Sequence, residues 1–115
     1  LARDFAERTR RDRVEFYLEW NLEPEKALRL ASQESRKRRD PGAYSLLAWA
    51  YYRNGNYDLA WSSIALALRR GVQHPEFFYR AAVIAKAAGK MDKYRTFAKK
   101  IRDITPNVEQ VYGPL

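Results

Sequence analysis

The chain has 115 residues, of which 46% are apolar and 31% are charged, and its formal net charge is +8. This size suits a single domain spanning residues 1–115, and the apolar content excludes an intrinsically disordered chain. Because the chain has no cysteine, a disulfide framework and a thiolate metal site are both excluded, and the redox compartment cannot be inferred.

The sequence contains no recognisable targeting or membrane-spanning segment. Its longest apolar run, around Leu46 to Tyr52, is well short of the roughly 20 residues that cross a bilayer. The first residues form no signal-peptide core, so we expect no membrane span and leave the cellular location open. The chain begins with leucine rather than methionine, which indicates a piece of a longer protein.

The chain resembles itself at an offset of 34 residues. This offset superposes the turn residues Asn21, Gly55 and Gly89, and it also superposes Pro41 on Pro75. Residue types with different structural roles share one spacing, which is typical of a helical repeat protein. The offset divides the chain into units at about residues 7–40, 41–74 and 75–108, and each unit contains two helical stretches.

The first unit has two apolar stretches around a turn at residues 21–24. Its apolar positions are Val14, Phe16, Tyr17, Leu18 and Trp20 before the turn, then Ala27, Leu28, Leu30 and Ala31 after it. Measured from its turn, the second helix of this unit starts one residue later than in the other units.

The central unit has the clearest pattern. Its first helix carries apolar residues at i, i+3, i+4 and i+7, and its second helix continues the pattern: Tyr44, Leu47, Ala48 and Tyr51, then Leu59, Ala60, Ile64, Ala67 and Leu68. Asp40 before Pro41 predicts the start of the first helix, and Asn56 is the expected cap of the second. Gly55 and Gly71 are expected to end the two helices with positive φ angles.

The third unit repeats this arrangement and is followed by a short tail. Its apolar positions are Phe78, Ala81, Ala82 and Ala85 before a turn at Gly89, then Tyr94, Ala98 and Ile101. In residues 106–115, Val108, Val111 and Tyr112 have helical spacing, but Gly113-Pro114 ends any helix at once. We predict either a short capping helix or the start of a fourth unit.

These residues resemble the tetratricopeptide repeat. The central unit carries the resemblance through Tyr44-x2-Leu47-Ala48-x2-Tyr51, Gly55-x-Tyr57, Ala60, Ile64 and Ala67, and the third through Phe78, Ala81, Ala82, Gly89 and Pro106. The resemblance covers about residues 8–107 and implies an all-α, right-handed solenoid of three antiparallel helix-turn-helix repeats. The first unit departs from the pattern, because Arg10 and Arg13 stand where an aromatic residue and a leucine are usual. Its first helix is therefore expected to pack loosely or to act as a cap.

By resemblance, the first helix of each unit lines a concave surface. The residues that these helices place outside the core are Ser45, Trp49, Tyr52 and Arg53, then Tyr79, Val83 and Lys86, and in the first unit Arg11, Glu15, Leu18 and Glu19. Aromatic rings beside Arg53 and Lys86 suit a peptide that offers an apolar side chain and a carboxylate. Alternatively, Trp49 and Tyr52 only complete the packing between units. The carboxylate clamp of the chaperone-tail-binding subgroup is not expected, since Ser45 and Trp49 occupy its lysine and asparagine positions.

The positive charge has two interpretations. Runs at Arg36-Lys37-Arg38-Arg39 and at Arg8, Arg10, Arg11 and Arg13 are able to bind nucleic acid phosphates. In the simpler interpretation, the cations of the first run interact with the negative end of a helix dipole. Those of the second run form ion pairs with Glu7, Asp12 and Glu15 on a solvated face. This favours an acidic protein partner over nucleic acid.

The sequence shows no catalytic constellation and implies no cofactor. The single histidine, His74, lies in a loop before Pro75, and no glycine-rich phosphate loop occurs. We therefore expect a protein-interaction module rather than an enzyme. The alternatives are a basic scaffold for nucleic acid and an architectural segment of a larger solenoid, which self-associates through an exposed terminal repeat.

Overall fold

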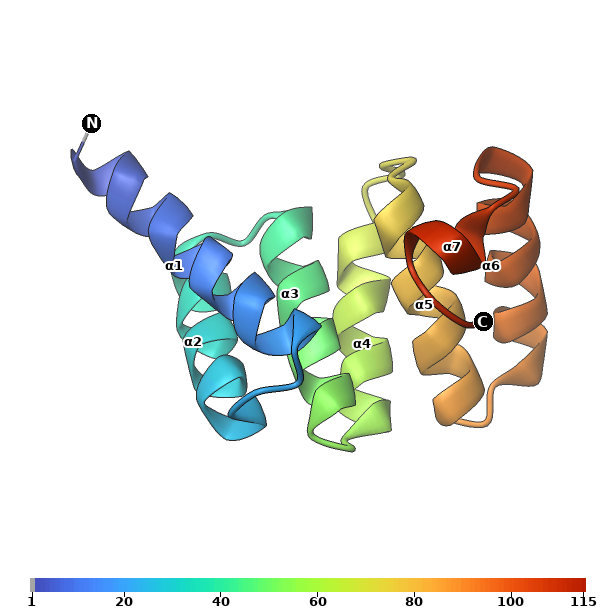
Figure 1. Cartoon of the computed structure of the whole chain (residues 1–115), viewed down its shortest axis with the longest axis horizontal. Coiled ribbons are helices and arrows are strands. Elements are labelled where there is room, and N and C mark those ends of the chain that lie inside the picture. The colour runs from blue at the N-terminus through green and yellow to red at the C-terminus, as the bar shows by residue number, and fades with distance from the viewer. Residues whose placement is uncertain (1) are drawn as a thin grey trace.

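The structure is a computed structural model that describes the backbone of residues 2–115 and the side chains of residues 10–115. This part of the chain is all-α, as predicted, with no strand. Its helices are α1 (Ala2–Glu19), α2 (Pro24–Lys37), α3 (Pro41–Arg53), α4 (Tyr57–Leu68), α5 (Pro75–Ala87), α6 (Met91–Ile104) and α7 (Val108–Val111) (Figure 1). None of these helices is both long and apolar enough to cross a membrane.

The helix boundaries follow local signals in the sequence. The carboxylate of Asp40 accepts a hydrogen bond from the amide of Ala43 at 2.9 Å, and Pro41 is the first residue of α3, as expected. Asn56 occupies the N-cap position of α4, but its side chain makes no capping hydrogen bond. The predicted boundary is therefore confirmed and the predicted side-chain cap is wrong.

The turns inside the helix pairs share one backbone feature. Asn21, Gly55 and Gly89 have φ angles of 51°, 77° and 76°. Glycine adopts this left-handed region without steric cost, and asparagine tolerates it better than most residues. As expected, α2 begins one position later after its turn than α4 and α6 do.

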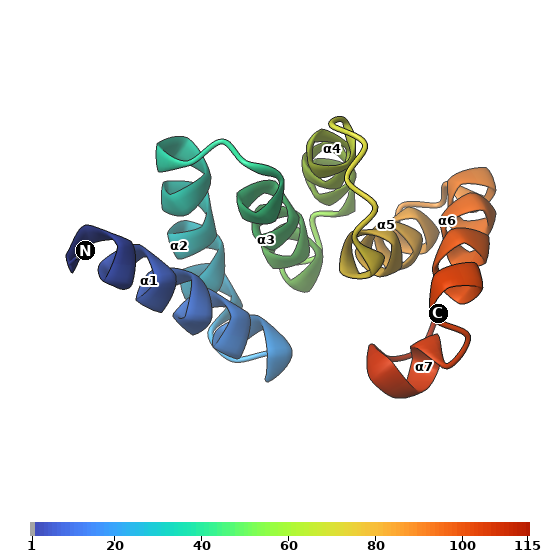
Figure 2. The same ribbon diagram turned by 90° about the horizontal axis from the view of Figure 1, so that it is seen from above.

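The helices pack mainly against their neighbours in the chain, and α3 also contacts α1 and α5. The molecule is elongated, with principal extents of 41 × 27 × 26 Å. Close approach of the helices depends on small residues, since Ala48, Ala60 and Ala82 are completely buried. In Figure 2, α3 and α5 face the lower side, α4 lies above them, and α1 and α7 project below at the two ends.

The first unit packs through charge as well as apolar contact. Glu34 of α2 is completely buried, and its carboxylate binds Arg10 Nη1 at 3.2 Å and Arg11 Nε at 2.6 Å. Arg11 Nη2 also binds Asp40 Oδ2 at 2.7 Å, so α1 is joined to both α2 and the start of α3. In agreement with the expectation that this helix packs loosely or acts as a cap, α1 contacts α2 less extensively than α3 contacts α4, and ion pairs to other helices help to hold it in place. The side chains of Glu7 and Arg8 lie outside the described residues.

Candidate functional site

Residues of α1, α3, α5 and α7 line a groove, and those of α3 and α5 form its floor. Figure 2 shows α3 and α5 between α1 and α7. The cavity volume of the groove is about 540 Å³. The lining side chains come from α1, α3, α5 and the C-terminal segment: Glu15, Glu19, Trp49, Tyr52, Arg53, Glu76, Tyr79, Arg80, Val83, Val111, Tyr112 and Pro114. The groove therefore brings together residues from all three sequence units.

The floor of the groove is aromatic. The ring of Trp49 stacks on Tyr52 with centroids 4.6 Å apart, and it lies 6.1 Å from the ring of Tyr79. Trp49 and Tyr79 are each only 8% exposed, whereas Tyr52 is half-buried. Both interpretations of Trp49 thus apply in part. It mainly completes the packing between helices, and its remaining exposed atoms line the groove.

Arg80 organises the centre of the site, although the sequence analysis did not select it. Its side chain is 6% exposed and donates to Ser45 Oγ at 2.8 Å. It also forms ion pairs with Glu76 at 2.6 Å and Glu15 at 3.3 Å, and its guanidinium lies 5.5 Å from the Trp49 ring. The 34-residue offset places Arg80 at the position of the buried Leu46. An arginine at a core position of the repeat was the signal that could have identified it.

Arg53 is also bound within the protein. Its Nε donates to the carbonyl oxygen of Leu18 at 3.1 Å, and its guanidinium lies 5.4 Å from the Trp49 ring and 6.0 Å from the Tyr52 ring. A guanidinium that already has a carbonyl partner and two aromatic faces is a weak site for a ligand carboxylate. The structure therefore gives little support to Arg53 as a carboxylate anchor.

The groove carries more negative than positive charge. Three carboxylates, of Glu15, Glu19 and Glu76, line it together with two guanidinium groups, of Arg53 and Arg80. Its formal charge is therefore −1, although that of the chain is +8. Although 46% of the Glu15 side chain is exposed, burial of its carboxylate raises its pKa, and Glu76 adds to this effect while Arg80 opposes it. A cation placed beside Glu15 and Glu19 would reduce the electrostatic repulsion between the carboxylates of the groove.

The remaining candidate residues lie outside the groove lining. Ser45 is 1% exposed and accepts the hydrogen bond from Arg80, so it supports the site from beneath. Arg11, near the middle of α1, is held by Glu34 and Asp40. Lys86 is exposed, and its Nζ donates to a main-chain oxygen of Leu115 at 3.3 Å. Leu18 is 1% exposed and belongs to the core.

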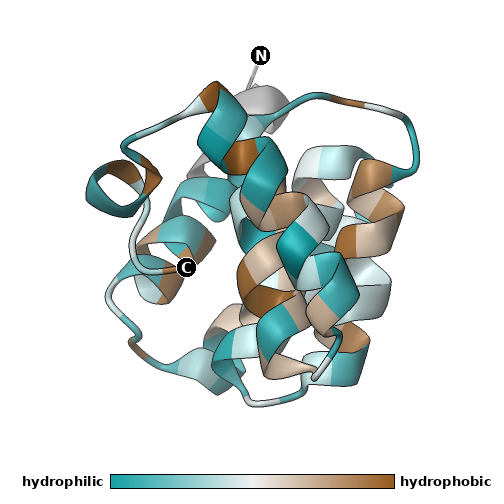
Figure 3. Cartoon of the chain, turned by 90° about the vertical axis from the view of Figure 1, so that its right-hand side faces the viewer, coloured by the Kyte–Doolittle hydropathy of each residue, from teal (hydrophilic) through white to brown (hydrophobic). Residues whose placement is uncertain are grey.

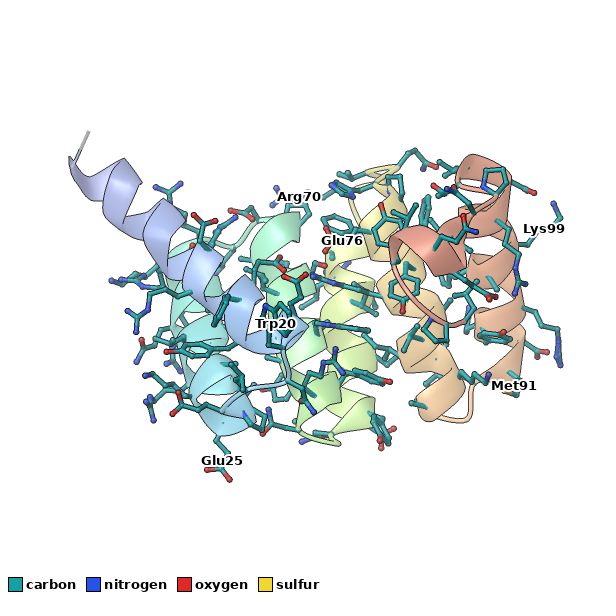
Figure 4. All side chains as sticks on the ribbon, viewed as in Figure 1. Trp20, Glu25, Arg70, Glu76, Met91 and Lys99 are labelled. Atoms are coloured by element: carbon teal, nitrogen blue, oxygen red, sulfur yellow. The ribbon has the colours of Figure 1, made fainter. Side chains whose placement is uncertain are left out.

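Exposed apolar side chains occur near the end of α1 and on α7. Trp20 directly follows α1 (Figure 4). It is 64% exposed, and Phe16 one turn earlier is 54% exposed. Val111 of α7 is 56% exposed. Of these three side chains Val111 lines the groove, where it provides apolar contact surface for a ligand.

The described residues contain no group of three or more metal-ligating side chains. His74 is exposed, caps the N-terminus of α5 by accepting from the amide of Glu76 at 3.2 Å, and stacks on Phe77 with centroids 4.8 Å apart. The histidine therefore has a structural role that the sequence analysis did not predict. Comparison of the chain with protein-family models, curated proteins and solved structures finds no match.

Proposed function

We propose that the chain is a protein-interaction module, built as a right-handed solenoid of three tetratricopeptide-like units, that holds a segment of a partner protein in the groove between α1 and α7. The recurrence of turns at 34 residues, their shared positive φ angles and the packing of successive helices support the repeat architecture. The architecture alone does not define a ligand, so the partner is argued from the groove.

One observation supports this function more than any other. The groove combines an aromatic floor with an excess of carboxylate, and both of its arginines are already bound within the protein. A segment that presents an arginine or lysine beside an apolar side chain matches both features, since its cation meets Glu15 and Glu19 while the apolar group contacts Tyr52 and Val83. We therefore replace the expected acidic ligand with a basic-apolar one at this site.

A positional-scanning library of eight-residue peptides with acetylated and amidated ends, applied to the whole chain, tests the proposal. We expect binding peptides to share a cationic residue at a fixed distance from an apolar one. Glu19→Gln should weaken the selected peptides about tenfold, because a charge-assisted contact of ~1.4 kcal/mol is lost. Glu25→Gln is the matched control, since Glu25 is exposed on α2 and points away from the groove (Figure 4).

A second variant tests the position of the ligand independently of charge. Val83→Trp should fill the groove and abolish peptide binding while preserving the helical circular dichroism spectrum. Selection of acidic peptides, or equal binding to the wild type and Val83→Trp, would refute the proposal.

A second candidate function is supported by α6. Within Met91–Ile104 five cations accompany two carboxylates, and Lys90 precedes the helix. Figure 3, which views the molecule from this end, shows mostly hydrophilic residues on the outer turns. This surface suits an anionic partner such as nucleic acid, whose phosphates are bound through charge. It lies on a different helix from the groove, so the two functions can be tested separately.

A further inference from the structure

The C-terminal residues 112–115 turn back onto α5 and form one end of the groove (Figure 1). The ring of Tyr112 stacks on that of Tyr79, with centroids 5.3 Å apart and an interplanar angle of 21°. Tyr79 Oη donates to the carbonyl oxygen of Pro114 at 3.2 Å, and Lys86 Nζ donates to a main-chain oxygen of Leu115, the last residue of the sequence, at 3.3 Å. One ring stacked on a ring and two main-chain oxygens held by side-chain donors are contacts of the kind that recognise an extended peptide.

The backbone of this tail requires a glycine between the ring and the main-chain oxygens. Gly113 has a φ angle of 131°, a conformation that other residues rarely adopt. A Cβ atom at this position would lie 2.9 Å from Tyr79 Oη. The close approach of the tail to Tyr79 therefore depends on the absence of a side chain at residue 113.

The tail is attached by few contacts. The helix α7 has only four residues, and Val108 is its one buried side chain. Tyr112 and Leu115 pack partly buried against the core, whereas Val111 is 56% exposed and Pro114 is exposed. Segments with so few buried contacts open locally far more readily than the whole protein unfolds. The tail can therefore leave Tyr79 while helices α1–α6 remain folded.

We infer that Tyr79 and Lys86 form a subsite for an aromatic side chain and the main-chain oxygens two and three positions after it, and that Tyr112–Leu115 fills this subsite in cis. A partner segment with an aromatic residue at the same spacing then displaces the tail. The part of the inference that concerns a partner rests on the proposed function. The docking of the tail itself does not, because it is tested with the tail sequence.

The covalent attachment of the tail determines how much free peptide the test requires. A segment joined to its site by a short link has an effective concentration on the order of millimolar. A free peptide with the tail sequence must therefore reach about this concentration to compete with the wild-type tail. It binds at lower concentration once the tail is released.

The probe is the acetylated and amidated peptide Val-Tyr-Gly-Pro-Leu, titrated into the ¹⁵N-labelled whole chain and followed by NMR. Gly113→Val should release the tail, seen as faster exchange of the amide hydrogen of Tyr112, which donates to the carbonyl oxygen of Val108 at 2.8 Å. In this variant, the amide signals of residues 79–86 should saturate with at least fivefold less peptide than in the wild type. Gln110→Ala is the control, since Gln110 is exposed three residues before Gly113, and it should behave as the wild type.

A second change tests the contacts rather than the release. Tyr79→Phe in the Gly113→Val background removes the hydroxyl donor and retains the ring, so the peptide should bind about fivefold more weakly. Three results would each overturn the inference: unchanged exchange of the tail in Gly113→Val, a released tail without peptide binding, or binding that Tyr79→Phe does not change.

These outcomes are distinct from failure of the proposed function. The proposed function fails if the peptide library and Glu19→Gln give no effect with the wild-type chain. The subsite fails only in the experiments with Gly113→Val and Tyr79→Phe. If the chain binds its own tail sequence but no library peptide, the subsite is supported and the proposed partner is refuted.

Discussion

Attachment of α1 depends most on one residue, Glu34 of α2. It is completely buried between two arginines whose side chains are 25% and 28% exposed. Removal of one partner from a buried ion pair costs more than the pair itself contributes, because the remaining charges lose their compensation. Partial exposure of the arginines reduces this cost.

We expect Glu34→Gln to lower the free energy of unfolding by about 2 kcal/mol in urea denaturation at pH 7. The control is Asp103→Asn, which breaks the exposed pair with Lys99 on α6 and should leave the midpoint unchanged. Equal effects of the two substitutions would show that α1 is not held by its buried charge.

The carboxyl groups of Asp40 and Glu15 both bind arginine, but we predict that their contributions to the free energy of unfolding change with pH in opposite directions. For Asp40, burial raises the pKa, but hydrogen bonds from Arg11 and the Ala43 amide outweigh it and lower the pKa below 3.8. Its stabilisation is present above pH 3.8 and is lost as the pH falls through the lowered value. For Glu15, burial raises the pKa above 4.5, so its contribution is favourable below pH 4.5 and is lost as the pH rises through the raised value.

Urea denaturation as a function of pH measures both effects. Asp40→Asn should be less stable than the wild type at pH 7, and the difference should vanish in strong acid. Glu15→Gln should gain stability relative to the wild type as the pH rises above 4.5. Parallel curves for the two variants would contradict the assignment of opposite environments.

At the residue scale, sequence reasoning identified side chains better than it identified their partners. It selected Glu15, Trp49 and Tyr79, which the structure brings into one groove. It paired Arg11 with acids on its own helix, whereas the partners lie on α2 and α3. Helical periodicity determines which face a residue occupies, but an arginine is long enough to select between several helices.

At the element scale, the turns show which positions the backbone constrains. Gly55 has a φ angle of 77°, and a Cβ atom there would meet nothing within 4 Å. Any cost of substitution therefore comes from the backbone conformation rather than from a clash.

We expect Gly55→Ala to lower the free energy of unfolding by about 1 kcal/mol. Gly55→Asn should cost clearly less, because Asn21 adopts a φ angle of 51° at the equivalent position of the first unit. Thermal or urea unfolding measures both variants. An equal loss for the alanine and asparagine variants would refute the equivalence of the turns.

The helices were predictable because their signals are local. Asp40-Pro41 starts α3, glycine or asparagine ends the first helix of each pair, and Gly113-Pro114 follows the end of α7. The return of residues 112–115 onto α5 was not predictable, since it depends on side chains 29 to 35 residues away. No periodicity encodes such a contact.

At the scale of the whole molecule, charge is distributed unevenly. The chain has a net charge of +8, yet the lining of the groove has a formal charge of −1 and the cations lie mostly elsewhere, five of them on α6. Three of the α6 cations are paired, in Arg95–Asp92, Lys99–Asp103 and Arg102–Glu109. An anionic partner would therefore bind outside the groove.

Lys90 and Lys93, both exposed at the start of α6, allow the nucleic acid hypothesis to be tested. If this helix binds phosphates, Lys90→Glu/Lys93→Glu should weaken binding of a fluorescent 20-base-pair DNA duplex at least tenfold in anisotropy titrations. The control Arg29→Glu/Lys37→Glu makes the same change in net charge on α2, so a localised site predicts a much smaller loss. Affinity should also fall steeply from 50 to 200 mM salt. Equal losses for the two double variants would show that net charge alone attracts DNA, and α6 would then have no specific role in binding.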